Sequence, residues 1–189
     1  MDVLAVGWLD FAEDGTIKEA HSTSTLVRTE GRTIVVDTSS KEMRPALKTS
    51  FKQIGVFPKD VDTVVLTHTH SDHSGNLDMF PGAQVIYHKG EKGEIPGARV
   101  IEEESLVIAK GVKLVHTPGH TPGSMSVFVE ADRKYAITGD AVPLEDNYLK
   151  MVPPRMCYDA RLALQSLKSI VSYADVVVPG HGFPFMTSR

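Results

Sequence analysis

The stretch that decides the fold is Val64-Val65-Leu66-Thr67-His68-Thr69-His70-Ser71-Asp72-His73, where an apolar run leads into three histidines and an aspartate. The apolar residues predict a buried strand. His68 and His70 stand two residues apart, so an extended backbone directs both side chains to one side. Imidazole and carboxylate groups are good ligands for divalent metal ions. Because burying this cluster without an ion would cost much desolvation energy, the stretch predicts a metal site at the end of a strand.

Three further polar residues follow predicted strands in the same manner. His120 lies in the turn Thr117-Pro118-Gly119-His120-Thr121-Pro122-Gly123, and both Asp140 and His181 follow a glycine at the end of an apolar run. A single histidine in such a place is more often a surface or core residue than a ligand. A fold that gathers these strand ends at one edge, however, would bring together seven candidate ligands: His68, His70, Asp72, His73, His120, Asp140 and His181.

The rest of the chain reads as many short strands and two helices. Helices are predicted over Lys41–Ile54 and Asp159–Val171, because apolar residues there recur at spacings of three or four. Lys89–Gly97 is expected to be a surface loop, and Ala141–Tyr158 a longer loop that lines the site. This mixture predicts sheets covered by helices in layers. The predicted strands are Val3–Leu9, Thr23–Val27, Thr33–Val36, Val61–Leu66, Gln84–Tyr87, Val112–Val115, Ser124–Val129, Tyr135–Thr138 and Asp175–Val178.

Composition narrows the class of protein. The 189 residues are expected to form one catalytic domain over 1–189. A net charge of −4 argues against a strongly basic nucleic-acid surface. Cys157, the single cysteine, excludes an internal disulfide and a cysteine-based zinc cluster. No apolar run approaches the ~20 residues of a membrane span, and no secretory signal is evident, so we expect a cytoplasmic protein without membrane contact.

The motif His68-Thr69-His70-Ser71-Asp72-His73 resembles the HxHxDH motif of the metallo-β-lactamase superfamily. His120, Asp140 and His181 match the remaining metal ligands of that superfamily in order and context. Within it, the chain is most similar to the short metallo-β-lactamase-domain-containing protein 1 group. The segments that carry this closer likeness are His73-Ser74-Gly75-Asn76-Leu77, Phe80-Pro81-Gly82 and the stretch Ala174–Phe185.

The resemblance implies an α+β fold of αββα type, a four-layer αβ/βα sandwich of two mixed β-sheets flanked by helices. It implies two divalent metal ions, with Zn²⁺ expected and Fe or Mn as alternatives. One ion would be bound by His68, His70 and His120, and the other by Asp72, His73 and His181, with Asp140 bridging the two. Since His181 lies close to the last residue, we expect a nearly minimal catalytic core without an appended substrate domain.

Such a site predicts a hydrolase in which a metal-bridging hydroxide cleaves an ester, thioester or lactone bond of a small substrate. Asp72 is the predicted catalytic residue, which orients the nucleophile and carries a proton. A bridging aspartate at the position of Asp140 resembles the sites of thioesterases, lactonases and nucleases of the superfamily. True β-lactamases generally lack it, so the resemblance disfavours a true β-lactamase. The alternatives are a phosphodiesterase or endoribonuclease acting on RNA, an iron-dependent oxidoreductase of the persulfide dioxygenase type, and a metal-binding module without catalysis.

Three further residues are candidates for substrate binding. His88 follows a predicted strand and could face the mouth of the site, while Tyr148 and Tyr158 lie in the predicted lining loop. For each of them a role as an ordinary surface residue is the competing interpretation. Exposed apolar residues such as Trp8 could equally belong to the core or to a homodimer interface.

Overall fold

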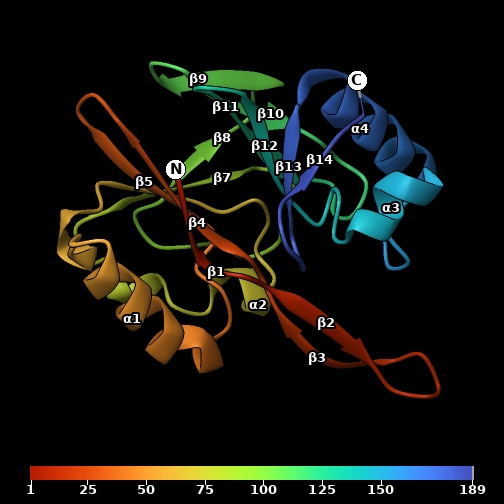
Figure 1. Cartoon of the computed structure of the whole chain (residues 1–189), viewed down its shortest axis with the longest axis horizontal. Helices are drawn as coiled ribbons and strands as arrows, with labels where there is room; N and C mark the ends of the chain where they lie inside the picture. Colours follow the sequence, from red (N-terminus) through yellow and green to blue (C-terminus); the bar gives the residue numbers. More distant parts are fainter. Residues whose placement is uncertain (189) are drawn as a thin grey trace.

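Two six-stranded sheets lie face to face, with helices on their outer surfaces (Figure 1). The structure, a computed structural model, describes residues 1–188. The first sheet has the order β1-β4-β5-β6-β7-β8, and its last four strands run parallel to one another. Its strands are β1 (Asp2–Ala5), β4 (Ser24–Thr29), β5 (Arg32–Val36), β6 (Thr63–Val65), β7 (Gln84–His88) and β8 (Arg99–Ile101).

The second sheet has the order β14-β13-β12-β11-β10-β9 and is also mixed, because β12 and β13 are parallel while its other neighbours are antiparallel. Its strands are β9 (Ser105–Ala109), β10 (Val112–His116), β11 (Met125–Glu130), β12 (Lys134–Gly139), β13 (Val176–Pro179) and β14 (Phe185–Met186). A separate hairpin of β2 (Trp8–Phe11) and β3 (Ile17–His21) extends away from the two sheets (Figure 1).

Helices close the sandwich on both sides. Helix α1 (Arg44–Gln53) packs Leu47 and Phe51 onto the outer face of the first sheet. Helix α4 (Ala160–Tyr173) packs Leu167 and Ile170 onto the outer face of the second. The shorter helices are α2 (Ser71–Ser74) and α3 (Glu145–Lys150), and three 3₁₀ turns cover Lys41–Met43, Pro58–Asp60 and Leu77–Met79. The expected four-layer sandwich of two mixed sheets is confirmed.

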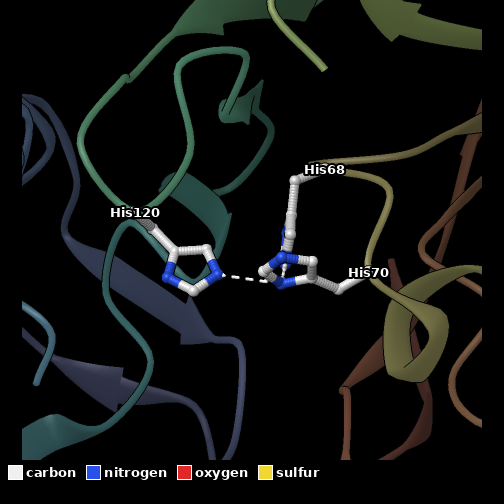
Figure 2. A group of neighbouring side chains, drawn as sticks. All are labelled: His68, His70 and His120. Atoms are coloured by element: carbon white, nitrogen blue, oxygen red, sulfur yellow. Dashed lines mark hydrogen bonds between the residues drawn. The ribbon is translucent and has the colours of Figure 1, made fainter. Parts of the chain in front are cut away.

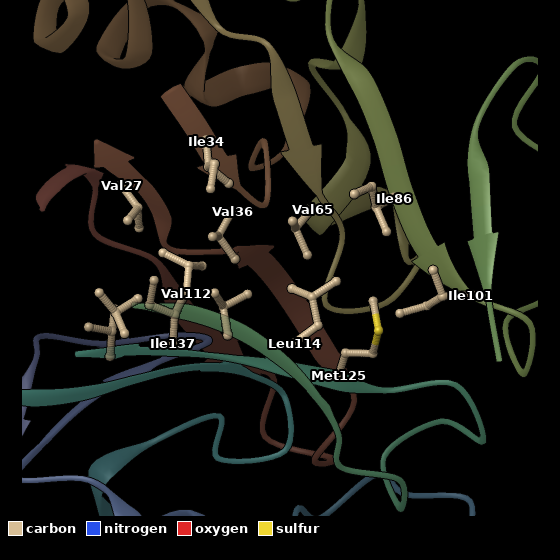
Figure 3. Packing of buried hydrophobic residues seen from close by; sticks show 13 residues of the cluster. Val27, Ile34, Val36, Val65, Ile86, Ile101, Val112, Leu114, Met125 and Ile137 are labelled. Atoms are coloured by element: carbon tan, nitrogen blue, oxygen red, sulfur yellow. The ribbon is translucent and has the colours of Figure 1, made fainter. Parts of the chain in front are cut away.

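The core between the sheets follows from the alternation of side chains along each strand (Figure 3). In β6, Val65 points into the space between the sheets, while Val64 points toward α1. In β13, Val178 faces the opposing sheet and Val177 faces α4. Strands that are buried on both faces therefore read as continuous apolar runs, which is why β5, β6 and β13 were predictable.

Several sequence expectations were wrong in detail. Val3–Leu9 is not one strand but two, since the chain leaves the first sheet near Gly7, where an added Cβ would lie 2.3 Å from the His21 carbonyl oxygen. Strands β3, β8, β9 and β14 were missed. Strand β3 is largely exposed and β8 and β14 have only three and two residues, whereas the apolar run 106–109 in β9 was not recognised as a strand. The predicted loop Ala141–Tyr158 contains α3. In residues 1–188, no helix combines the length and the apolar character that crossing a membrane requires.

Candidate metal centre

The candidate ligands converge where strands of both sheets end. His68 follows β6 in the first sheet, while Asp140 and His181 follow the neighbouring parallel strands β12 and β13 in the second. His120 comes from the turn between β10 and β11. Because parallel strands present their carboxyl ends at the same edge, residues far apart in the chain meet there.

Three histidines form the first group (Figure 2). Nδ1 of His70 lies 3.0 Å from Nε2 of His68 and 3.1 Å from Nε2 of His120. The rings stand nearly perpendicular to one another, with interplanar angles of 81–89°. Three ring nitrogens from two sheets therefore point at one small volume.

Asp72, His73 and His181 form the second group, and Asp140 lies between the two groups. Nε2 of His73 is 3.6 Å from Oδ2 of Asp72, and Nε2 of His181 is 3.7 Å from the same oxygen. One oxygen of Asp140, Oδ1, lies 3.3 Å from Nε2 of His73 and 3.1 Å from Nε2 of His181. Its other oxygen, Oδ2, lies 3.4 Å from Nε2 of His120. The carboxylate of Asp140 thus reaches both groups.

Two atoms at this centre are buried and make no hydrogen bond to residues 1–188: Nε2 of His73 and Oδ1 of Asp140. A buried polar atom without a partner costs about 1–3 kcal/mol, so native proteins rarely leave one. Imidazole nitrogen and carboxylate oxygen are both ligands of divalent transition metals. The residues present therefore fit a metal centre, and the orphaned atoms are those that a metal would satisfy.

In three of the candidate ligand histidines, the ring nitrogen that faces away from the centre contacts a hydrogen-bond acceptor. Nδ1 of His73 lies 2.7 Å from Oδ2 of Asp37. Nδ1 of His181 lies 2.9 Å from the His21 carbonyl oxygen, and Nδ1 of His120 lies 2.8 Å from that of Met156. Because these acceptors require a proton on Nδ1, the lone pair of Nε2 is left to face the centre. Three rings are thus held in the tautomer that a metal ligand needs.

The electrostatics of the centre follow from burial and close charges. Burial, together with the neighbouring His73, lowers the pKa of His68 well below its usual value, and burial with His120 nearby lowers the pKa of His70. Burial opposes the charged forms of His73 and Asp140, but the carboxylates beside His73 raise its pKa well above normal. His73 and His181 in turn hold the pKa of Asp140 well below normal. The centre therefore keeps Asp140 ionised and His68 neutral.

Comparison with known proteins decides the family. The metallo-beta-lactamase superfamily model matches residues 17–107 and 94–181, which together span most of the chain. The chain belongs to the metallo-beta-lactamase superfamily. This metallo-beta-lactamase-type chain is 38% identical over 169 residues to a metallo-hydrolase of Methanocaldococcus jannaschii, covering 89% of this chain and 80% of that protein. It is 33% identical to the mouse metallo-beta-lactamase domain-containing protein 1, covering 99% of this chain and 74% of that one.

Relatives with a named reaction are more distant. N-acyl homoserine lactonase of Bacillus cereus is 29% identical, and the match covers 65% of this chain and 54% of the lactonase. Among solved structures, a Thermotoga maritima protein of the metallo-beta-lactamase type shares the fold, with a TM-score of 0.81 at 22% identity, covering 98% of this chain and 97% of that one. The match to a quorum-quenching N-acyl homoserine lactone hydrolase has a TM-score of 0.69 at 25% identity, covering 83% and 77% of the two chains.

Two cavities border the metallo-beta-lactamase centre. One of about 510 Å³ lies beside Asp72 and is also lined by Ser40, Lys41 and Ser71. The other, of about 340 Å³, lies beside His70 and His120 and is lined by Tyr158 among others. The side chain of Tyr158 is 71% exposed, so it stands at the rim of this second cavity. Its predicted role in substrate binding is compatible with that place and stays a prediction.

The other two substrate-binding candidates lie elsewhere. His88 is buried, its ring stacks on His116 at a centroid distance of 4.0 Å, and its Nδ1 accepts a hydrogen bond from the Gly90 N–H. The hydroxyl of Tyr148 lies 2.8 Å from Oγ of Ser188, and its ring stacks on Phe185. Neither residue lines either of the two cavities.

Sequence reasoning missed two residues that support the centre. Asp37 accepts hydrogen bonds from the N–H and the hydroxyl of Thr67, in addition to its contact with His73. His21, which had no identifiable partner in the sequence, is buried between Ser40 and Glu19 and presents its carbonyl oxygen to His181. Asp37 directly follows the apolar strand β5, and this was the one available signal. His21 had none, because Ser40 and His181, which its ring and its carbonyl oxygen contact, lie in other parts of the chain.

Proposed function

We propose that the protein is a dinuclear metal-dependent hydrolase that cleaves an ester, thioester or lactone bond of a small substrate. The observation that carries the proposal is the convergence of two ligand groups on one carboxylate. Nε2 of His73 and Oδ1 of Asp140 are buried there, 3.3 Å apart, without making a hydrogen bond to any described residue. A purely structural cluster would satisfy these atoms within the protein. The net charge of −4 also favours a small substrate over a polyanion.

The proposed ligand sets follow the two groups. His68, His70 and His120 would hold one divalent ion, and Asp72, His73 and His181 a second, with Asp140 shared between them. We propose Zn²⁺ as the ion, since imidazole and carboxylate groups are common zinc ligands. The same ligand set, which contains no thiolate, also suits Fe and Mn, which are the alternatives. When bound, such a metal pair supplies Lewis acidity and a water molecule of lowered pKa.

The chain's own residues then orient the substrate and move protons. Asp72 is partly buried and lines the 510 Å³ cavity, while its Oδ2 lies 3.6 Å from Nε2 of His73, so the residue stands between the cavity and the centre. In this place it would accept a proton from the attacking water and pass it toward the leaving group. Asp140, held ionised by His73 and His181, keeps negative charge between the two ligand groups.

Among the proposed substrate classes, lactones have the most direct support, because the relatives that are named for a reaction are lactonases. Lactonases of Bacillus share 28–30% identity with this chain over about two thirds of its length. The volumes of about 340 and 510 Å³ beside the centre suit small organic ligands.

The decisive experiment combines metal analysis with a substrate panel. Protein loaded with Zn²⁺ should bind two ions per chain and hydrolyse at least one member of a panel of lactones, thioesters and aryl esters. Two bound ions without turnover on the whole panel would contradict the proposal. Cleavage of a labelled RNA instead would replace it with a nuclease, and oxygen uptake with a persulfide would replace it with an iron oxidoreductase.

Variants at Asp72 and at a surface aspartate test the proposed catalytic role. We expect Asp72→Asn to lower kcat by at least 100-fold while the fold persists, because the amide cannot accept the proton. Asp78→Asn is the matched control, since Asp78 pairs with Arg44 at the surface, and it should keep parental turnover. An Asp72→Asn enzyme with near-parental kcat would remove Asp72 from the proposed mechanism.

A further inference from the structure

Glu91 joins the two loops that carry the three-histidine group. It lies just after β7, in the stretch that the sequence predicted to be a surface loop, and it is only partly exposed. Its Oε2 accepts hydrogen bonds from the N–H and the hydroxyl of Thr69, both at 3.0 Å. Its Oε1 accepts a hydrogen bond from the hydroxyl of Thr121.

The two threonines are the immediate neighbours of the histidines. Thr69 stands between His68 and His70, and Thr121 follows His120. The first loop leaves β6 of the first sheet, whereas the second connects β10 and β11 of the second sheet. One carboxylate therefore ties the two sheets together at the point where the three ring nitrogens meet.

Backbone packing leaves this carboxylate little freedom. An added Cβ at Gly90 would lie 2.7 Å from the Gly123 nitrogen, and one at Gly123 would lie 2.5 Å from the Glu91 nitrogen. The Glu91 N–H also donates to the His88 carbonyl oxygen at 3.0 Å. The loop that carries Glu91 is thus pressed against the loop that carries His120. A charged acceptor in such a contact makes stronger hydrogen bonds than a neutral one.

We propose that Glu91 is a positioning residue that sets the distance between His120 and the pair His68 and His70, and thereby the metal affinity of this group alone. The inference deepens the proposed function, on whose metal centre it rests. Glu91 does not lie among the residues grouped as ligands, and it acts through Thr69 and Thr121. Its loss would let the turn 117–123 move relative to the loop after β6. The ligands Asp72, His73 and His181 make no contact with it and would keep their ion.

The test compares four proteins: parent, Glu91→Ala, Glu91→Gln and Glu94→Ala. Glu94 is the matched control, because it lies exposed in the same loop and its variant removes the same charge. Each protein is loaded with Zn²⁺, titrated with a chelator and analysed for bound metal. Supporting partners of metal ligands are worth 10–100-fold in affinity, so we expect Glu91→Ala to lose one ion at about tenfold lower chelator concentration. The second ion should leave as in the parent.

Three further comparisons exclude a merely structural effect. Co²⁺-substituted Glu91→Ala should show an altered visible spectrum, whereas Glu94→Ala should match the parent. Glu91→Gln retains one acceptor oxygen, and its amide nitrogen can donate to the other threonine hydroxyl, so it should recover part of the lost affinity. The thermal midpoints of the metal-free proteins should agree within about 3 °C, which shows that the fold itself is intact.

The outcomes separate this inference from the proposed function. If Glu91→Ala holds both ions as tightly as the parent, or loses both equally, the positioning role is wrong whatever the enzyme hydrolyses. If the parent binds two ions without turnover, the proposed reaction is wrong. The role of Glu91 is then still decided by whether Glu91→Ala loses one ion more easily than the parent. A parent that binds no metal overturns both.

Discussion

Asp37 shows how much one residue outside the ligand set can determine. It has a positive φ of 55°, a backbone conformation that aspartate and asparagine tolerate better than most residues. This conformation lets one carboxylate receive three donors: the N–H and hydroxyl of Thr67 and the ring of His73. It therefore orients the strand end that leads into His68 and the ring of another candidate ligand at once.

We expect Asp37→Asn to weaken metal binding by about 10–100-fold, the usual cost of removing an outer partner of a ligand histidine. Asparagine can adopt the same φ, but its amide carries no charge for the His73 ring. Competition with a fluorescent zinc chelator measures the loss. Asp60→Asn, at an exposed turn, is the control and should bind zinc like the parent. Equal zinc affinity in parent and Asp37→Asn would contradict this role.

At the scale of elements, the turn between β10 and β11 matters most, because it delivers His120. The sequence predicted a rigid turn from its prolines and glycines, and the structure supplies the reason for one of them. Gly119 has a φ of +141°, and an added Cβ would lie 2.3 Å from the Cα of Ala163 in α4. The turn is thus packed directly against α4, and this contact fixes the position of His120.

We expect Gly119→Ala to destabilise the protein by about 1–3 kcal/mol, the usual cost of overpacking, and also to weaken metal binding. The methyl group would have to displace helix backbone, which cannot yield as a flexible side chain can. Chemical denaturation measures the free energy of unfolding. Gly82→Ala is the control, since nothing lies within 4 Å of a Cβ there, and it should unfold like the parent. Equal stability of the two variants would refute the close packing.

The ends of β7 and β10 meet through the stacked rings of His88 and His116, which makes this contact sensitive to pH. Burial first, and then the neighbouring His116, lowers the pKa of His88 below 6.5. A hydrogen bond to the backbone of Glu102 and the charge of Glu104 oppose this lowering of the pKa, and the charge of Lys89 adds to it. Below pH 6.5 the unfolded chain therefore takes up a proton at His88 more readily than the folded one, and stability falls as the pH falls.

The measurement is the free energy of unfolding between pH 7.5 and 5.5, with metal-free protein. His88→Gln cannot titrate, so it should lose less stability over this range than the parent. Comparing the two slopes cancels the contribution of the metal-site histidines, which both proteins share. Parallel slopes would show that His88 does not contribute.

At the scale of the whole molecule, the candidate metal centre is built from both sheets. Its candidate ligands come from the first sheet through His68, His70, Asp72 and His73, and from the second through His120, Asp140 and His181. A metal bound only by the folded protein stabilises it by about 2.7 kcal/mol at a free concentration of 100 Kd. Bound ions should therefore hold the halves of the sandwich together.

We expect removal of metal by a chelator to lower the thermal midpoint by about 5–10 °C, and added Zn²⁺ to restore it. Differential scanning fluorimetry before and after dialysis measures the change, and chelator already saturated with zinc is the control. An unchanged midpoint after complete removal of two ions would mean that ligation does not stabilise the fold.

Much of the fold and of the centre was predictable from local patterns. The buried strands β5, β6, β12 and β13 are apolar runs that end in polar residues, and the seven candidate ligands follow such runs or lie in a Pro/Gly turn. The edge strand β14 escaped prediction because it has only two residues. Strand β9 escaped although residues 106–109 are apolar, because a short apolar run does not by itself identify a strand. The short helix α3 escaped because prolines surround it and it has only six residues.

The sequence by itself determined the family, the layered fold and the candidate ligands, because these depend on spacing and residue type within short segments. Only the tertiary structure decided what surrounds the ligands. Asp37 meets His73 across 36 positions of the chain, His21 meets His181 across 160, and Glu91 meets Thr69 across 22. It also placed His88 and Tyr148 away from both cavities beside the centre, and Tyr158 at the rim of one. Such contacts depend on how two sheets pack, and packing is a property of the whole chain rather than of any segment.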